Sequence, residues 1–172
     1  MDEAFCPQAD EGVLRTSAPH RLSRPVPMKR GVVWADGGIR GNPGGVSACA
    51  AVLYVDGEMP RQKSKLIGGR GTSNQAEYYG LMMALRLAAE FEVTHLKVRL
   101  DSKLVVEQVL GNWRVKQPAL LPLRDRAREL AAMYFEEVRI GLVPREENTE
   151  ADRICTRLLD NATGRVRGKS RR

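Results

Sequence analysis

Four acidic side chains, drawn from four separate stretches of this 172-residue chain, have the types and spacing of a metal site: Asp36, Glu77, Asp101 and Asp152. Carboxylates brought close together repel and raise one another's pKa, a conflict that a bound cation removes. Hard oxygen ligands without histidine or cysteine favour Mg²⁺ or Mn²⁺. Two such ions can serve phosphodiester hydrolysis, because one activates water while the other stabilises the leaving oxygen.

Each of these acids also has an ordinary explanation when taken alone. Asp36 could be a turn residue, and Asp101 could cap the helix that follows it. Glu77 and Asp152 could be acids favoured by the dipole at a helix N-terminus. Only their combination indicates a site.

Two of the acids end predicted strands. An apolar run ending at Trp34 predicts a buried strand over 31–36, and two glycines follow its terminal Asp36. A second strand, predicted over 96–101, ends on Asp101. Because a helix lies between them, a right-handed crossover makes the two strands parallel. Their carboxylates should then lie side by side at the edge where open α/β sheets bind ligands.

The remaining elements should cover and complete this sheet. Strands are predicted over 46–55 and 61–67, joined by the hairpin turn Asp56-Gly57, and over 138–143. Helices are predicted over 72–91, 102–110 and 122–135, and a last one begins at Asn148 or Thr149. The first turns of two of these helices carry Glu77 and Asp152. The fold class is therefore α/β: a mixed five-stranded sheet, three antiparallel strands then two parallel ones, covered by helices.

Composition sets the outer limits. Residues 1–30 carry prolines and charges without periodicity, so they are interpreted as a disordered extension to a domain over 31–160. The net charge is +7, and residues 160–172 hold five basic side chains and one acidic. A basic tail over 161–172 suits a polyanion such as nucleic acid, or serves only as a solubilising end. Three scattered cysteines favour a reducing cytoplasm, and no apolar run predicts a membrane span.

The stretches around the four acids resemble the type 1 ribonuclease H family. They are 36–44, 72–77, 101–106 and 148–152, and the similarity covers about residues 31–160. The resemblance implies a ribonuclease H-like fold and an endonuclease, expected to be a monomer, that hydrolyses the RNA strand of RNA–DNA hybrids. It also implies two Mg²⁺ ions, with Mn²⁺ as a possible substitute, held by the four carboxylates.

The same resemblance implies a set of substrate contacts. Asn42 and Asn74 match positions that contact the backbone and minor groove of the hybrid, and Thr72 and Ser102 fall near DNA-phosphate contacts. Trp113 and Lys116, in a loop with alternating basic residues, would add to hybrid binding, although Trp113 could equally be a packed loop aromatic.

One family feature is absent from the sequence. The mobile histidine that precedes the last acid in other members has no counterpart, because the only histidines are His20 and His95. Arg145, Glu146 and Glu147 occupy that loop instead. Proton transfer would then depend on metal-bound water or on a loop carboxylate.

Two other functions compete. A non-catalytic domain of this fold could bind RNA–DNA hybrid or RNA, but a pure binder has no use for clustered negative charge facing phosphates. Another nuclease or an integrase could share the fold, but Asn42, Asn74 and Thr72 favour hybrid recognition.

Overall fold

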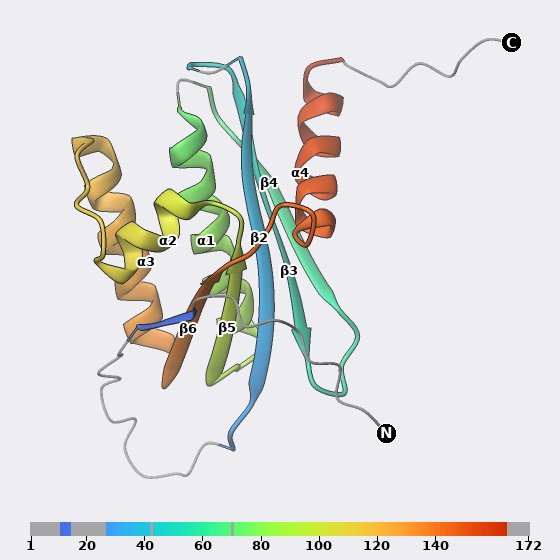
Figure 1. Ribbon diagram of the computed structural model, residues 1–172. Coiled ribbons are helices and arrows are strands. Elements are labelled where there is room, and N and C mark those ends of the chain that lie inside the picture. Colours follow the sequence, from blue (N-terminus) through green and yellow to red (C-terminus); the bar gives the residue numbers. More distant parts are fainter. Residues whose placement is uncertain (1–10, 15–26, 42, 70, 165–172) are drawn as a thin grey trace, which may run out of the picture.

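The protein, seen in a computed structural model that describes residues 11–14, 27–41, 43–69 and 71–164, is built on one mixed sheet (Figure 1). Its strand order is β1-β6-β5-β2-β3-β4. The strands are β1 (Glu11–Leu14), β2 (Arg30–Arg40), β3 (Val46–Val55), β4 (Arg61–Ile67), β5 (His95–Leu100) and β6 (Glu137–Leu142). β2, β5 and β6 are parallel neighbours, which confirms the predicted crossover, and the other pairs are antiparallel.

Helices cover the two faces of the sheet unequally. One face carries α1 (Ser73–Glu90), α2 (Lys103–Leu110) and α3 (Leu121–Tyr134), the last preceded by the short 3-10 turn η1 (Pro118–Leu120). The opposite face carries α4 (Thr149–Ala162) alone, as Figure 1 shows. The layered α/β class predicted from the sequence is confirmed.

The main core lies between the sheet and α1 to α3. Leu81 and Leu85 of α1, Leu100 of β5 and Leu130 of α3 are almost completely buried in it. Each such side chain contributes about 1.5–3 kcal/mol relative to exposure. Under α4 the buried cluster is much smaller and consists of Ala48, Ala50, Cys155 and Leu159.

A sixth strand differs from the five expected. Glu11–Leu14 pairs antiparallel with β6, so this part of the predicted extension belongs to the sheet. Glu11 also forms a 2.6 Å ion pair with Arg99 of β5. Residues 1–10 and 15–26, and most of the predicted basic tail, lie outside the described residues, so the boundaries at 30 and 161 otherwise stay predictions.

β2 also runs further than expected. The strand was predicted to stop at Asp36, but it continues through Gly37 and Gly38 to Arg40. Pairing with β5 ends at Trp34–Arg99, while pairing with β3 continues to Arg40–Val46. The two glycines that follow Asp36 therefore lie inside the strand, and Gly37 allows the backbone of α1 to approach it closely.

Candidate active site

Three of the four predicted acids converge where β2 and β5 separate. One carboxylate oxygen from each of Asp36, Glu77 and Asp101 lies within 4.8 Å of the other two. Asp36 comes from the middle of β2, Asp101 follows the last residue of β5, and Glu77 comes from the second turn of α1. Within the described residues this is the one group of three or more acidic, histidine or cysteine side chains placed to share a metal ion.

Glycines bring α1 close enough to deliver Glu77. A Cβ on Gly37 would lie 2.0 Å from the carbonyl oxygen of Ala76, so no larger residue fits without moving the helix. A Cβ on Gly80 would lie 2.7 Å from the carbonyl oxygen of Asp36. Thr72 fixes the start of the helix through a capping box with Gln75.

The electrostatics of the cluster suit a divalent cation. Burial, followed by repulsion from Asp36 and Asp101, raises the pKa of Glu77 from 4.5 to about 9. Burial, with repulsion from Asp101 and Asp152, raises the pKa of Asp36 from 3.8 to about 6. A divalent cation among these oxygens would offset that repulsion and hold both groups ionised.

Asp152 stands slightly apart from the three. Its Oδ1 accepts a 2.8 Å hydrogen bond from Arg145 Nη2, and the arginine side chain is 75% exposed. Asp152 lies in the first turn of α4 and is close enough to Asp36 to raise its pKa. The loop residue that replaces a histidine thus contacts the fourth predicted acid directly.

Two further side chains of this region were not predicted as site residues. Cys155 Sγ lies 3.4 Å from the carbonyl oxygen of Ala48 and within hydrogen-bonding range of the Asp36 carboxylate. Asn148 was predicted only as a possible helix cap. It occupies the N-cap position of α4 but makes no side-chain cap bond, and instead it contacts Asp101. Its place four residues before Asp152 was the available signal.

The predicted substrate contacts fall into two groups. Asn74, Trp113 and Lys116 line one hollow of about 530 Å³, together with Gln108, Asn112 and Arg114 among others. Trp113 is 45% exposed and Lys103 lies over its ring at 5.7 Å, so it is not a packed loop aromatic.

Of the other predicted contacts, two lie at helix starts and one lies outside the described residues. Thr72 Oγ1 accepts from the Gln75 backbone, and Ser102 is the N-cap of α2 with no side-chain cap bond. Asn42 lies outside the described residues.

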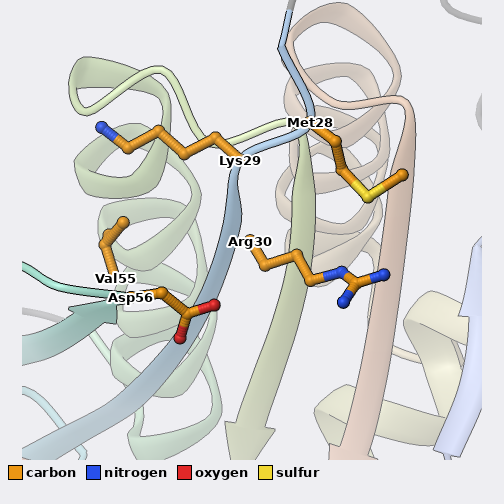
Figure 2. Close-up of a pocket in the computed structure, with 5 residues that line it drawn as sticks. All are labelled: Met28, Lys29, Arg30, Val55 and Asp56. Atoms are coloured by element: carbon orange, nitrogen blue, oxygen red, sulfur yellow. The ribbon is translucent and has the colours of Figure 1, made fainter.

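A second hollow, of about 320 Å³, lies at the other end of β2 (Figure 2). It is lined by Met28, Lys29, Arg30, Val55 and Asp56. Lys29 pairs with Glu58 at 2.7 Å, and Asp56 belongs to no acidic cluster among the described residues. Its side chains therefore offer no chemistry comparable to that at the acids.

No helix in the described part of the chain is both long and apolar enough to cross a membrane.

Comparison with known proteins finds a matching family model and similar proteins. A family model described as "Reverse transcriptase-like" matches residues 35–158. Ribonuclease HI of Halobacterium salinarum is 37% identical over 157 residues, which is 90% of this chain and 78% of that protein. The bifunctional protein Rv2228c of Mycobacterium tuberculosis is 44% identical over 131 residues, 76% of this chain, and the match spans only 36% of that protein's length.

Solved structures agree with these relatives. The N-terminal RNase H domain of the mycobacterial protein has a TM-score of 0.72 at 40% identity, over 79% of this chain and 97% of that one. LC11-RNase H1 in complex with an RNA/DNA hybrid has a TM-score of 0.71 at 29% identity, over 77% of this chain and 99% of that one.

Proposed function

We propose a function for this chain from one premise: the chain belongs to the type 1 ribonuclease H family. In this proposal it is an endonuclease that hydrolyses the RNA strand of RNA–DNA hybrids. The observation that carries the proposal is the convergence of Asp36, Glu77 and Asp101 within 4.8 Å at the point where β2 and β5 separate. A relative of known structure, LC11-RNase H1, was solved with an RNA/DNA hybrid, which supports the same substrate here.

Asp36, Glu77, Asp101 and Asp152 would hold two Mg²⁺ ions, with Mn²⁺ as a substitute. When bound, the ions would supply an activated water and stabilise the leaving oxygen. Because burial raises the pKa of Glu77 to about 9, this side chain must release a proton when metal binds near neutral pH, whereas Asp36, with its pKa raised to about 6, is already mostly ionised there.

The loop before α4 would take the place of a histidine in handling the substrate. Arg145 stays protonated and cannot accept a proton, but its exposed guanidinium can move from Asp152 towards a phosphate. Glu146 and Glu147 can accept a proton. Since the reaction rests on the metal-holding acids, Glu146→Gln or Glu147→Gln should each cost at most about 10²-fold.

Substrate binding would use the hollow beside α2. Trp113 offers an exposed ring, Lys116 and Arg114 offer positive charge for phosphates, and Asn74 offers an amide for a groove. Thr72, Ser102 and Asn42 would extend these contacts, and the basic residues of 161–172 would add attraction to the polyanion. The 2′-hydroxyl distinguishes the RNA strand. A cytoplasmic monomer is the expected form.

Cleavage assays with end-labelled RNA–DNA hybrid, duplex RNA and duplex DNA test this function. Each substrate is incubated with Mg²⁺, Mn²⁺ or EDTA. Cleavage should appear only in the RNA strand of the hybrid and only with metal. Asp36→Asn should lower the rate by more than about 10²-fold, because metal-ion catalysis supplies several kcal/mol. Asp56→Asn, which changes an exposed turn acid, is the matched control. Tight binding of the hybrid without any cleavage would instead establish the non-catalytic alternative.

A further inference from the structure

The side chain of Asn148 is buried beside the acids and tied to them. The residue is 1% exposed, although it stands at the start of a surface helix. Its Nδ2 donates one hydrogen bond to the Ala35 carbonyl oxygen and one to Asp101 Oδ1, both at 2.9 Å. Both protons of the amide are therefore used at the site, and none is used to cap α4.

This amide lies in the gap that β2 and β5 leave. The backbone pairing of the two strands ends at Trp34–Arg99, one residue before Ala35 and two before Asp101. Asn148 joins the next backbone oxygen of β2 to the carboxylate that follows β5. It replaces backbone pairing with a side-chain bridge at the place where the metal-holding acids must be fixed.

The orientation of the amide is determined by its neighbours. Ala35 O and Asp101 Oδ1 are both acceptors, so only the NH₂ group can face them. Asn148 Oδ1 is left without a hydrogen-bond partner among the described residues. An unpaired buried acceptor costs about 1–3 kcal/mol, which a residue chosen for stability alone would avoid.

The backbone of Asn148 serves the fourth acid. Its carbonyl oxygen accepts a 3.2 Å hydrogen bond from the backbone N–H of Asp152 and so begins α4. One residue thus links the carboxylate of Asp101, the strand that carries Asp36 and the helix turn that carries Asp152.

We propose that Asn148 is a positioning residue that orients the Asp101 carboxylate for divalent-metal binding. By donating to Oδ1, it fixes the rotation of the carboxylate and leaves the other oxygen free for the ion. The inference rests on the proposed function, because it needs a metal to bind there. Partners that orient a metal ligand are typically worth 10–100-fold in affinity.

The test measures Mn²⁺ binding to the full chain without any nucleic acid, by isothermal titration calorimetry. Asn148→Ser and Asn148→Ala remove the bridge, and serine also keeps a residue suited to a helix N-cap. Asn161→Ala, at an exposed position on the same helix, is the matched control. Both Asn148 variants should bind Mn²⁺ about 10–100-fold more weakly, and the control should match the unsubstituted protein.

Two further readouts separate positioning from a general loss of structure. Thermal unfolding in EDTA identifies variants that are folded. In hybrid cleavage, raising the Mg²⁺ concentration should restore most of kcat in Asn148→Ser while KM for the hybrid stays constant. Folded Asn148→Ser that binds Mn²⁺ as tightly as the unsubstituted protein would overturn the inference, as would a lower unfolding midpoint with unchanged Mn²⁺ affinity. If the unsubstituted protein binds no Mn²⁺, the proposed function itself fails.

Discussion

The two faces of the sheet contribute to the same cluster of acids in opposite ways. On one face, α1 packs so closely that only glycine fits at Gly37, and it delivers Glu77, whose pKa burial raises to about 9. On the other face, α4 packs its own Cys155 and Leu159 over Ala48 and Ala50 of β3. It delivers Asp152, which is 30% exposed and paired with Arg145. One acid is half-buried on a helix that packs into the dense core, and the other is paired at the surface with an exposed arginine.

The two faces therefore differ in how firmly they hold Glu77 and Asp152. The α1 face holds its acid by backbone contacts that cannot move without disturbing the main core. On the α4 face, Asp152 is paired with Arg145, whose side chain is 75% exposed, and a surface ion pair of this kind is a weak restraint. The two acids are therefore held with unequal firmness.

The largest expected effect comes from adding one methyl group at Gly37, and the same change at the neighbouring Gly38 is its matched comparison. In Gly37→Ala the new Cβ meets the backbone of Ala76 at 2.0 Å, whereas in Gly38→Ala it meets the flexible Leu159 Cδ1 at 3.2 Å. Overpacking against fixed backbone should cost Gly37→Ala at least about 3 kcal/mol, while Gly38→Ala stays near 1 kcal/mol. Urea unfolding measures the stability of both variants, and hybrid cleavage measures their activity. Equal losses in the two variants would refute the contrast between the faces.

Truncating one leucine on each face compares the two cores. Leu85 lies in the main core and Leu159 in the small cluster under α4, and both are at most 2% exposed. Leu85→Ala should cost about 3–5 kcal/mol and Leu159→Ala about 2 kcal/mol, because the cavity under α4 can collapse more easily. The free energies of unfolding from denaturant titration decide the order. A larger loss for Leu159→Ala would show that α4 is as firmly packed as α1.

The pH dependence of folding stability should report the raised pKa of Glu77. A folded-state pKa of about 9 against 4.5 means that folded Glu77 keeps its proton where the unfolded chain has lost it. In EDTA, the contribution of Glu77 to folding stability should therefore be largest below about pH 4.5. It should fall as pH rises towards 9. Glu77→Gln should flatten that fall in thermal unfolding. Identical pH profiles for Glu77→Gln and the unsubstituted protein would contradict the buried position.

The smallest effect is expected on the exposed side. Arg145→Ala removes a surface ion pair and should change stability by no more than about 1 kcal/mol. Its effect should appear as a higher KM for the hybrid, because a phosphate contact is lost. Arg153→Ala, at an exposed position of α4, is the control. A loss of kcat as large as that of Asp36→Asn would show that Arg145 acts in the chemical step.

Local patterns were sufficient to predict most elements and the convergence of the acids. The apolar helix after Thr72 and the Asp56-Gly57 hairpin are set by neighbours in sequence, and the structure reproduces them. The continuation of β2 through Gly37 could not be predicted, because a glycine weakens a strand pattern. The close approach of α1 that requires glycine there is defined only in the folded protein. The bridge made by Asn148 depends on a gap between two strands that only the assembled sheet defines.

β1 has a consequence for the order in which the chain folds. It is the earliest described strand in the sequence, yet it pairs with β6, so that Glu11 lies opposite Gly141. During synthesis from the N-terminus, β1 has no partner until nearly the whole domain has been made, and closing so long a loop is slow. Until then the outer edge of β6 presents unpaired backbone groups, which are open to pairing with other chains. We therefore expect the first strand made to be the last one paired, and its docking to cover the edge of β6, while β4 remains the opposite edge of the sheet.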